Sequence, residues 1–332
     1  MAEIAALAGL SESTVSRALA GNRFVNADTR RRVKALAQEL GYRVNPVARS
    51  LRSRKARTIG VMIPLQHDEE QQPSDSFLLG LLGGIADALA ERDYDLLLSP
   101  PRSDIEEWIS RCLGTGQAGG VIVLGQSYHH ELLNEAASQG AAMVVWGADV
   151  AGRSYATVGS DNRAAGRAAA MHLIKIGRRK LAFLGDVRLP EVAQRYQGFQ
   201  DALAVAGLDP GAAPPVSVHF GAGQAYAEAV AFLGGDPDID GIFAASDVIG
   251  MGAIRALVGA GHRVPGDVAV VGFDDVPLAE VASPPLTTLR QNSAKGAAAL
   301  VELLLDQIAG HPAKSVVIPA ELVVRGSTVP GA

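Results

Sequence analysis

The first forty residues carry short apolar stripes with helical spacing. Apolar side chains recur three and four residues apart within residues 2–8, which predicts a short helix, and Gly9 is suited to end it in a left-handed conformation. Ser11 is suited to cap a second helix with a similar inner face. Two short helices joined by a glycine-containing turn predict a helix-turn-helix motif. The expected inner positions are Ile4, Leu7, Ala8, Val15, Ala18 and Leu19.

A third helix is predicted over about 28–40, and a short basic segment follows it. The third helix has an apolar stripe of Val33, Leu36, Ala37 and Leu40, and Gly41 is its expected stop. We expect residues 1–44 to form one small all-α domain. Residues 45–58 are expected to be a hinge, with Asn45 as cap and Pro46 at the first helical position. This hinge helix should be marginal alone, and a plain linker is the alternative interpretation.

From Thr58 onward, continuous apolar runs of strand length alternate with amphipathic helical stretches. That alternation is typical of parallel sheets covered by helices on both faces. The expected strands are 58–65, 94–100, 119–125, 141–147, 180–186, 216–220, 241–246 and 268–275. There are too many such units for one compact sheet, so the sequence predicts an α/β body, residues 59–332, with two lobes. We place the first lobe at about 59–160 and 290–318, and the second at about 161–288 and 320–330.

Charge is divided unevenly along the chain. Residues 1–58 hold 12 Lys and Arg against 4 Asp and Glu, a net charge of +8. The whole chain of 332 residues carries −5, so the remainder carries −13. A small basic head on a large acidic body predicts a polyanionic partner for the head alone. A solvated basic helix is the alternative interpretation.

Composition and missing motifs exclude several classes of protein. Hydrophobic residues make up 48% and charged residues 20% of the chain, which excludes wholesale disorder. No run of about 18 apolar residues predicts a membrane span. The start lacks a basic region typical of export signals, and Cys112 is the single cysteine, so we expect a cytoplasmic protein without disulfides.

Enzymatic chemistry is not expected either. The run GTGQAG, residues 114–119, precedes an apolar strand instead of following one, which is the wrong context for a dinucleotide site. No Walker A sequence and no nucleophile elbow occur, and the histidines have no partners at zinc spacing. The sequence therefore predicts no catalytic residues, no cofactor and no metal site.

The motifs of the head carry a family resemblance. The strings ALAGLSESTVSRAL, TRRRVKALAQELGYRVNPVARSL and TIGVMIP occur in the order typical of the LacI/GalR family of bacterial repressors, and the chain resembles this family from Met1 to about Arg325. The resemblance implies that the second helix enters the major groove of an operator and that Leu51 inserts into the minor groove. The expected DNA contacts are Ser11, Glu12, Ser13, Thr14, Ser16, Arg17, Asn45, Arg49 and Leu51.

The same resemblance implies a type I periplasmic-binding-protein-like body that binds a small effector between its lobes. A homodimer would place two heads on a near-palindromic operator. No heptad pattern follows Arg325, which favours a dimer over a tetramer. The effector would change the lobe arrangement and, through the paired hinges, the affinity for DNA.

Residues after predicted strands nominate the effector pocket, because ligands of such sheets bind outside the carboxyl ends of strands. Trp146 and Phe220 could stack on an apolar ligand face, although Trp146 could equally be core. Ser246 could be a helix cap, and Arg195 could belong to a surface ion pair. With resemblance added, the expected effector contacts are Asp75, Phe77, Trp146, Asp161, Arg195, Phe220, Ser246, Asp274 and Gln291.

These side chains suit a neutral, hydroxyl-rich molecule. Carboxylate, guanidinium, amide and hydroxyl groups can bond sugar hydroxyls while aromatic rings stack on the sugar. The sequence therefore predicts a DNA-binding repressor regulated by a small sugar or glycoside. A nucleobase or nucleoside co-repressor on the same architecture, and a sugar-binding protein that does not bind DNA, are the alternatives.

Overall fold

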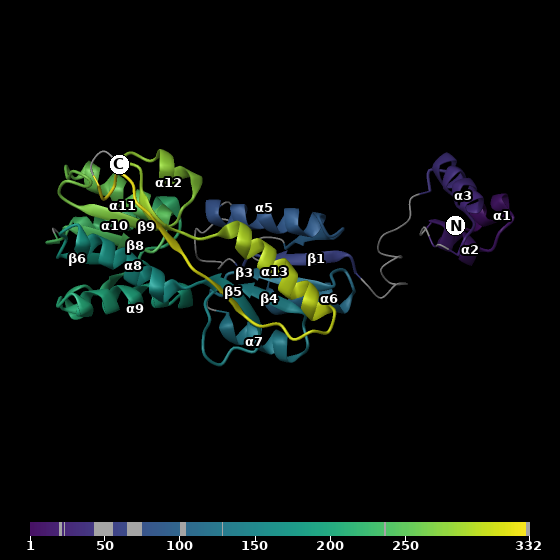
Figure 1. Ribbon diagram of the computed structural model, residues 1–332, viewed down its shortest axis with the longest axis horizontal. Helices are drawn as coiled ribbons and strands as arrows, with labels where there is room; N and C mark the ends of the chain where they lie inside the picture. The colour runs from purple at the N-terminus through teal and green to yellow at the C-terminus, as the bar shows by residue number, and fades with distance from the viewer. Residues whose placement is uncertain are drawn as a thin grey trace. The chain divides into compact units, whose positions relative to one another are not determined.

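The computed structural model describes residues 1–19, 22, 24–42, 56–64, 75–99, 104–127, 129–235 and 237–329. The chain divides into two compact units, Met1–Ala56 and Arg57–Ala332 (Figure 1). The expected hinge contacts Asn45, Arg49 and Leu51 lie outside the described residues. No helix in the described part of the chain combines the length and apolar character that a membrane crossing requires.

The first unit contains three helices around a small core, as its stripes predict. These are α1 (Ala2–Ala8), α2 (Glu12–Leu19) and α3 (Ala27–Glu39). Gly9 ends α1 with a φ of 64°, in the left-handed conformation that glycine adopts without strain. The helix-turn-helix prediction is confirmed. Leu7 and Leu40 were predicted to face inward but are exposed, because in so small a unit only one edge of each helix is covered.

The first lobe of the second unit is a parallel sheet of order β11-β5-β4-β3-β1-β2. Helices α5 (Ser76–Ala90) and α13 (Ser293–Ile308) pack together on one of its faces. Helices α6 (Ile105–Gly114) and α7 (His130–Ser138) cover the other. The strands are β1 (Thr58–Met62), β2 (Asp95–Leu98), β3 (Gly120–Leu124), β4 (Met143–Trp146), β5 (Ala156–Ser160) and β11 (Val316–Ile318).

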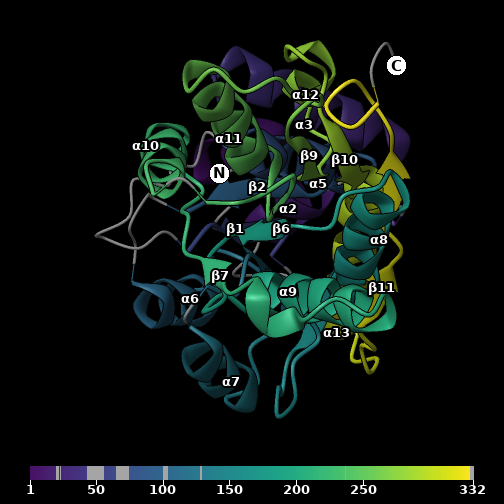
Figure 2. The same ribbon diagram turned by 90° about the vertical axis from the view of Figure 1, so that its left-hand side faces the viewer.

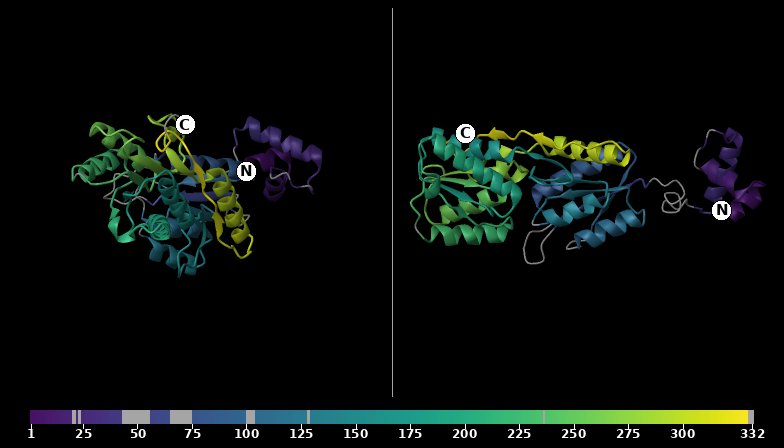
Figure 3. Two further views of the ribbon diagram at one scale, coloured as in Figure 1. Left: turned by 60° about the vertical axis from the view of Figure 1, so that its left-hand side comes forward. Right: turned by 90° about the horizontal axis from the view of Figure 1, so that it is seen from below.

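The second lobe is a sheet of order β12-β10-β9-β8-β6-β7, parallel except for the β10–β12 pair. Helices α8 and α9 pack together, as do α10 and α11, and Figure 3 shows helices on both faces of each sheet. The strands are β6 (Leu181–Leu184), β7 (Pro215–Val216), β8 (Gly241–Ala244), β9 (Ala269–Asp274), β10 (Thr287–Arg290) and β12 (Glu321–Val323). The helices are α8 (Asn162–Lys175), α9 (Pro190–Val205), η1 (Pro210–Ala212), α10 (Ala222–Leu233), α11 (Asp247–Gly259) and α12 (Pro277–Val281).

The predicted α/β class with parallel sheets is confirmed, with several differences among the strands. Strands β10, β11 and β12, near the C-terminus, were not among the expected strands. The run 216–220 was predicted to be a strand, but only Pro215–Val216 pairs, because β7 is an edge strand that needs little pairing. Strand β5 was missed because its sequence, ATVGS, is short and holds two β-branched residues among small ones, with no long apolar run. The C-terminal segment passes from the first sheet at β11 to the second at β12 (Figure 1).

Glycines set the distance between α8 and α9, which lie side by side in Figure 2. A Cβ added to Gly198 of α9 would lie 1.9 Å from the carbonyl oxygen of Arg163. A Cβ added to Gly166 of α8 would lie 2.0 Å from the carbonyl oxygen of Arg195. Both distances are far below van der Waals contact. The two helix backbones can therefore lie this close only because neither position carries a side chain. This approach also fixes the position of Arg195 relative to α8.

We therefore expect Gly198→Ala to lower the free energy of unfolding by about 3 kcal/mol, since two rigid backbones must move apart. Urea denaturation of the full chain measures the change. Gly223→Ala in α10 is the matched control, because an added Cβ there meets nothing within 4 Å. An equal loss of stability in both variants would contradict the close-approach argument.

Candidate functional site

The outer surface of α2 presents short polar and basic side chains. The residues predicted to contact DNA in this helix and its cap are Ser11, Glu12, Ser13, Thr14, Ser16 and Arg17. The Ser11 hydroxyl accepts a hydrogen bond from the Thr14 amide at 3.3 Å, so it caps the helix as predicted. Glu12, Ser13 and Arg17 are exposed, and the Arg17 Nε donates to the Ser13 carbonyl at 3.3 Å. The helix therefore offers a guanidinium and hydroxyls on one surface.

A cavity of about 870 Å³, open to solvent, lies where the carboxyl ends of the strands of both lobes meet. Both lobes contribute side chains, which is the expected place for a ligand in parallel sheets. Seven of the nine predicted effector contacts line it. The lining comprises Ile63, Pro64, Asp75, Phe77, Leu78, Leu124, Gly125, Ser127, Trp146, Gly147, Gly159, Ser160, Asn162, Leu189, Glu191, Arg195, Phe220, Asp274 and Gln291.

Three aromatic side chains give the cavity its apolar surface. Phe77 and Trp146 come from the first lobe, with ring centroids 5.7 Å apart and planes tilted by 46°. Phe220 comes from the second lobe. Trp146 is only 7% exposed and packs over Gly296 of α13, so it belongs to the core and lines the cavity at the same time. Rings contributed by both lobes suit a ligand with flat apolar faces.

Arg195 is the cation in the cavity lining, and the protein holds it firmly. Its Nε donates to the Oδ1 of Asn162 at 2.9 Å, and its Nη1 donates to the carbonyl of Ala245 at 2.6 Å. The guanidinium also lies 3.5 Å above the ring centroid of Phe273, a cation–π contact. The guanidinium is thus oriented before any ligand arrives.

A hydrogen-bonded chain joins the two lobes at the floor of the cavity. The Ser160 hydroxyl, at the end of β5, donates to the Oε1 of Gln291 at 2.7 Å. The Nε2 of Gln291 donates to the Oδ1 of Asp274 at 2.7 Å. Asp274 ends β9 with a φ of 120°, a conformation that side chains rarely adopt. Strain of this kind persists where the surroundings hold a functional side chain in place.

Burial governs the protonation of this cluster. Desolvation raises the pKa of Asp274 well above its usual value, with the nearby charges of Asp247 and Asp75 acting in the same direction and Arg195 opposing them. Burial also raises the pKa of Glu191 and lowers the pKa of Arg195. The Asp247 carboxylate, whose pKa rises to about 7 through burial, accepts from the Val276 amide and the Thr288 hydroxyl behind the cavity. The site thus gathers several buried acids.

Two predicted effector contacts lie outside this cavity, because both oxygens cap helices. The Ser246 hydroxyl accepts from the amide of Ile249 at 3.2 Å, at the start of α11. The Asp161 Oδ1 accepts from the amide of Ala164 at 3.0 Å, at the start of α8. Asp275, which follows Asp274 in the chain, pairs with Arg290 and Arg325.

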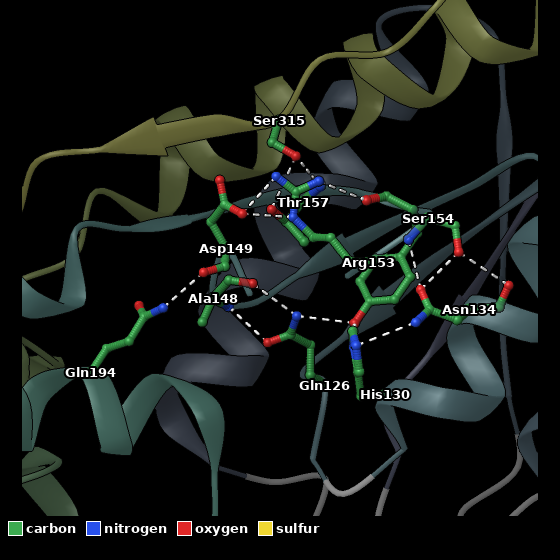
Figure 4. Close-up of polar contacts among 11 residues, drawn as sticks. Gln126, His130, Asn134, Ala148, Asp149, Arg153, Ser154, Thr157, Gln194 and Ser315 are labelled. Carbon is green, nitrogen blue, oxygen red and sulfur yellow. Dashed lines mark hydrogen bonds and ion pairs between the residues drawn. The ribbon is translucent and has the colours of Figure 1, made fainter. Parts of the chain in front are cut away.

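Asp161 lines a second space, which it shares with Asp149 and Gln194. Figure 4 shows Gln194 of α9 reaching toward the loop after β4, where its Nε2 donates to the carbonyl of Asp149 at 2.8 Å. Gln126 holds that loop from the other side through both backbone groups of Ala148. The loop is therefore tied to both lobes.

Sequence reasoning missed four polar residues of the main cavity, namely Ser127, Ser160, Asn162 and Glu191. Glu191 precedes Arg195 by four positions on α9, so helical spacing alone could have placed both on one face. Ser160 ends β5, the strand that was missed, and Asn162 follows it. Among the described residues, no group of three His, Cys, Asp or Glu could hold a metal ion.

Comparison with known proteins agrees with this arrangement. Residues 1–45 match a family model described as bacterial regulatory proteins, lacI family, and residues 170–328 match a periplasmic binding protein-like domain. The transcriptional regulator CelR of Thermobifida fusca is 33% identical over 331 residues, which span 98% of this chain and 96% of CelR. A solved complex of a transcriptional regulator CelR with cellobiose matches with a TM-score of 0.73 and 32% identity over 98% of both chains.

The lac repressor dimer bound to operator and the anti-inducer ONPF has the same fold, with a TM-score of 0.86 at 23% identity over 98% of both chains. Similarity to CelR runs through the head and the two-lobed body together. On that full-length similarity, the chain belongs to the lacI family of bacterial regulatory proteins.

Proposed function

We propose that this protein is a cytoplasmic repressor of transcription that binds operator DNA as a homodimer. A small sugar or glycoside that enters the cavity lowers or raises its affinity for the operator. The observation that carries the proposal is a cavity built from both lobes, with carboxylates, a guanidinium, an amide and aromatic rings. Membership of the lacI family and similarity to regulators of transcription support the DNA-binding part. The family relation also argues against an enzyme.

The basic head supplies the affinity for DNA. Its net charge of +8 over residues 1–58 pairs with phosphates, and release of counterions makes the affinity fall steeply with salt. Helix α2 enters the major groove, where Arg17 can bond a guanine edge and Ser13 can bond a phosphate. Asn45, Arg49 and Leu51 act in the hinge.

The cavity supplies the regulation. A ligand held by Asp274 and Arg195 from the second lobe and by Phe77 and Trp146 from the first favours one lobe arrangement. That arrangement changes how easily the paired hinges fold on DNA. Couplings of this kind are typically about 1–3 kcal/mol and are reciprocal, so a sugar that weakens DNA binding binds more weakly to the DNA complex.

Fluorescence anisotropy with labelled duplexes from the region upstream of the protein's own gene tests the proposal. Binding is measured at two salt concentrations, with and without glucose, cellobiose, maltose and other small sugars. We expect salt-sensitive binding to one duplex and a changed affinity with one sugar. Failure to bind any of these duplexes would contradict the DNA-binding part, and binding that no sugar alters would contradict the effector class.

Arg17→Ala is expected to lower operator affinity by about tenfold to a hundredfold, the effect of losing one bidentate base contact. Sugar binding by the body should be unchanged, as measured by calorimetry. Glu39→Gln, an exposed change at the end of α3, is the control for altered charge in the head. Operator affinity that survives Arg17→Ala would remove this residue from the DNA contacts.

A further inference from the structure

Glu191, in the cavity lining, has one carboxylate oxygen without a hydrogen-bond partner among the described residues. The residue lies in the first turn of α9 and lines the cavity beside Arg195. Its Oε2 is buried and has no hydrogen-bond partner in the described part of the chain. A buried oxygen without a partner is costly and rare in native proteins, so it calls for a missing donor.

Arg195 is the obvious partner for Glu191, since the two are four residues apart on one helix. Its guanidinium instead donates to Asn162 and to the Ala245 carbonyl and lies over the Phe273 ring. Arg195 therefore acts on Glu191 through charge, and no described residue supplies a donor to the Oε2.

The cavity holds more acids than bases. Asp75, Glu191 and Asp274 line it, whereas Arg195 is its one Lys or Arg among the described lining residues. The Asp75 Oδ1 already accepts from the amides of Phe77 and Leu78 as the cap of α5. The Oδ1 of Asp274 already accepts from Gln291. A carboxylate or phosphate on a ligand would be repelled by these acids, whereas a ligand hydroxyl would find hydrogen-bond acceptors among them.

We propose that Glu191 sets the charge selectivity of the cavity: its Oε2 accepts a hydrogen bond from a hydroxyl of a neutral sugar, and its charge excludes sugar acids and sugar phosphates. The proposal deepens the proposed function and rests on it. It places Glu191 alongside Asp274 as a contact of the ligand, with a second role in rejecting the wrong ligands.

Calorimetry with the full-length protein and matched probes tests the selectivity. Glucose is compared with glucuronate, glucuronamide and glucose 6-phosphate, and cellobiose with cellobionate. Glucuronamide matches glucuronate in size but carries no charge. The wild type is expected to prefer the neutral member of each pair by at least about tenfold. Glu191→Gln keeps the shape of the side chain. We expect it to weaken the binding of neutral sugars about tenfold and to reduce the preference for neutral over acidic probes.

Asp201→Asn is the matched control, because it removes a carboxylate from the same helix at an exposed position paired with Arg163. A preference that Glu191→Gln leaves unchanged, or that Asp201→Asn narrows equally, overturns the proposal. Tighter binding of the acidic probes by the wild type overturns it too, while the sugar class of effector stands. If no carbohydrate of either charge binds to the folded protein, the proposed effector class and this proposal both fail.

Thermal unfolding without ligand separates a ligand contact from a structural role. A buried carboxylate oxygen that lacks a donor in the absence of ligand destabilises the ligand-free protein. Glu191→Gln should therefore raise the unfolding temperature or leave it unchanged. A lower unfolding temperature would mean that Glu191 serves the fold, and would overturn its assignment to the ligand.

Discussion

Asp274→Ala is expected to lower sugar affinity by about a hundredfold and to abolish the effect of sugar on operator binding. The carboxylate lies at the end of β9, held by Gln291 and facing the cavity beside Arg195. A side chain fixed in advance gives up little entropy when it forms a hydrogen bond with a ligand hydroxyl. Operator affinity without sugar should match the wild type, since Asp274 belongs to a different compact unit from the DNA-binding helices.

Fluorescence anisotropy and calorimetry on the same preparation check both halves of this expectation. Asp274→Asn is the conservative variant, which keeps the shape and one acceptor and should lose less affinity than the alanine variant. A normal response to sugar in Asp274→Ala would remove Asp274 from the site. Loss of operator binding in the absence of sugar would show that the substitution disturbs more than the cavity.

The backbone at Asp274 adds an independent check on the same residue. At a φ of 120°, alanine is strained as aspartate is, whereas glycine is not. We therefore expect the free energy of unfolding of Asp274→Gly to exceed that of Asp274→Ala by about 1 kcal/mol. Equal stabilities would mean that the conformation is not held under strain.

Most of the cavity was predictable because the ends of parallel strands converge. Long apolar runs located β4 and β9, and the residues that end them, Trp146 and Asp274, face the cavity. Gln291, which matched the family pattern, follows β10 and reaches the same floor. The periodicity of an element and the direction of its strand thus suffice to place a side chain at the sheet edge.

Two predicted effector contacts lie outside the cavity lining and stay predictions, because two uses of one side chain share a sequence pattern. A serine or aspartate between a strand and a helix can cap the helix or face a ligand. In this structure Ser246 and Asp161 each cap a helix. The sequence shows the position but not which donor lies within reach. Glu191 was not predicted to line the cavity for a related reason. A glutamate in the first turn of a helix is common, and only the packing shows that its Oε2 is buried without a partner.

Arg195→Ala is expected to cause the largest loss of stability of any substitution considered, about 3–5 kcal/mol. The side chain is 5% exposed, and its removal leaves Asn162 Oδ1 and the Ala245 carbonyl without their donor. It also leaves Glu191 and Asp274 without the nearby positive charge that opposes their burial. Denaturant unfolding measures the loss, and the sugar response should vanish with it.

Arg195→Lys tests whether geometry or charge matters more. An ammonium is compact and not planar, so it cannot reach both acceptors while also lying flat over the Phe273 ring as the guanidinium does. Lysine should therefore recover only part of the stability. Arg163→Ala, on α8, is the control: it breaks an exposed pair with Asp201 and should change stability little. Arg195→Ala as stable as Arg163→Ala would mean that the buried guanidinium does not hold the second lobe together, and that its place in the cavity serves the ligand alone.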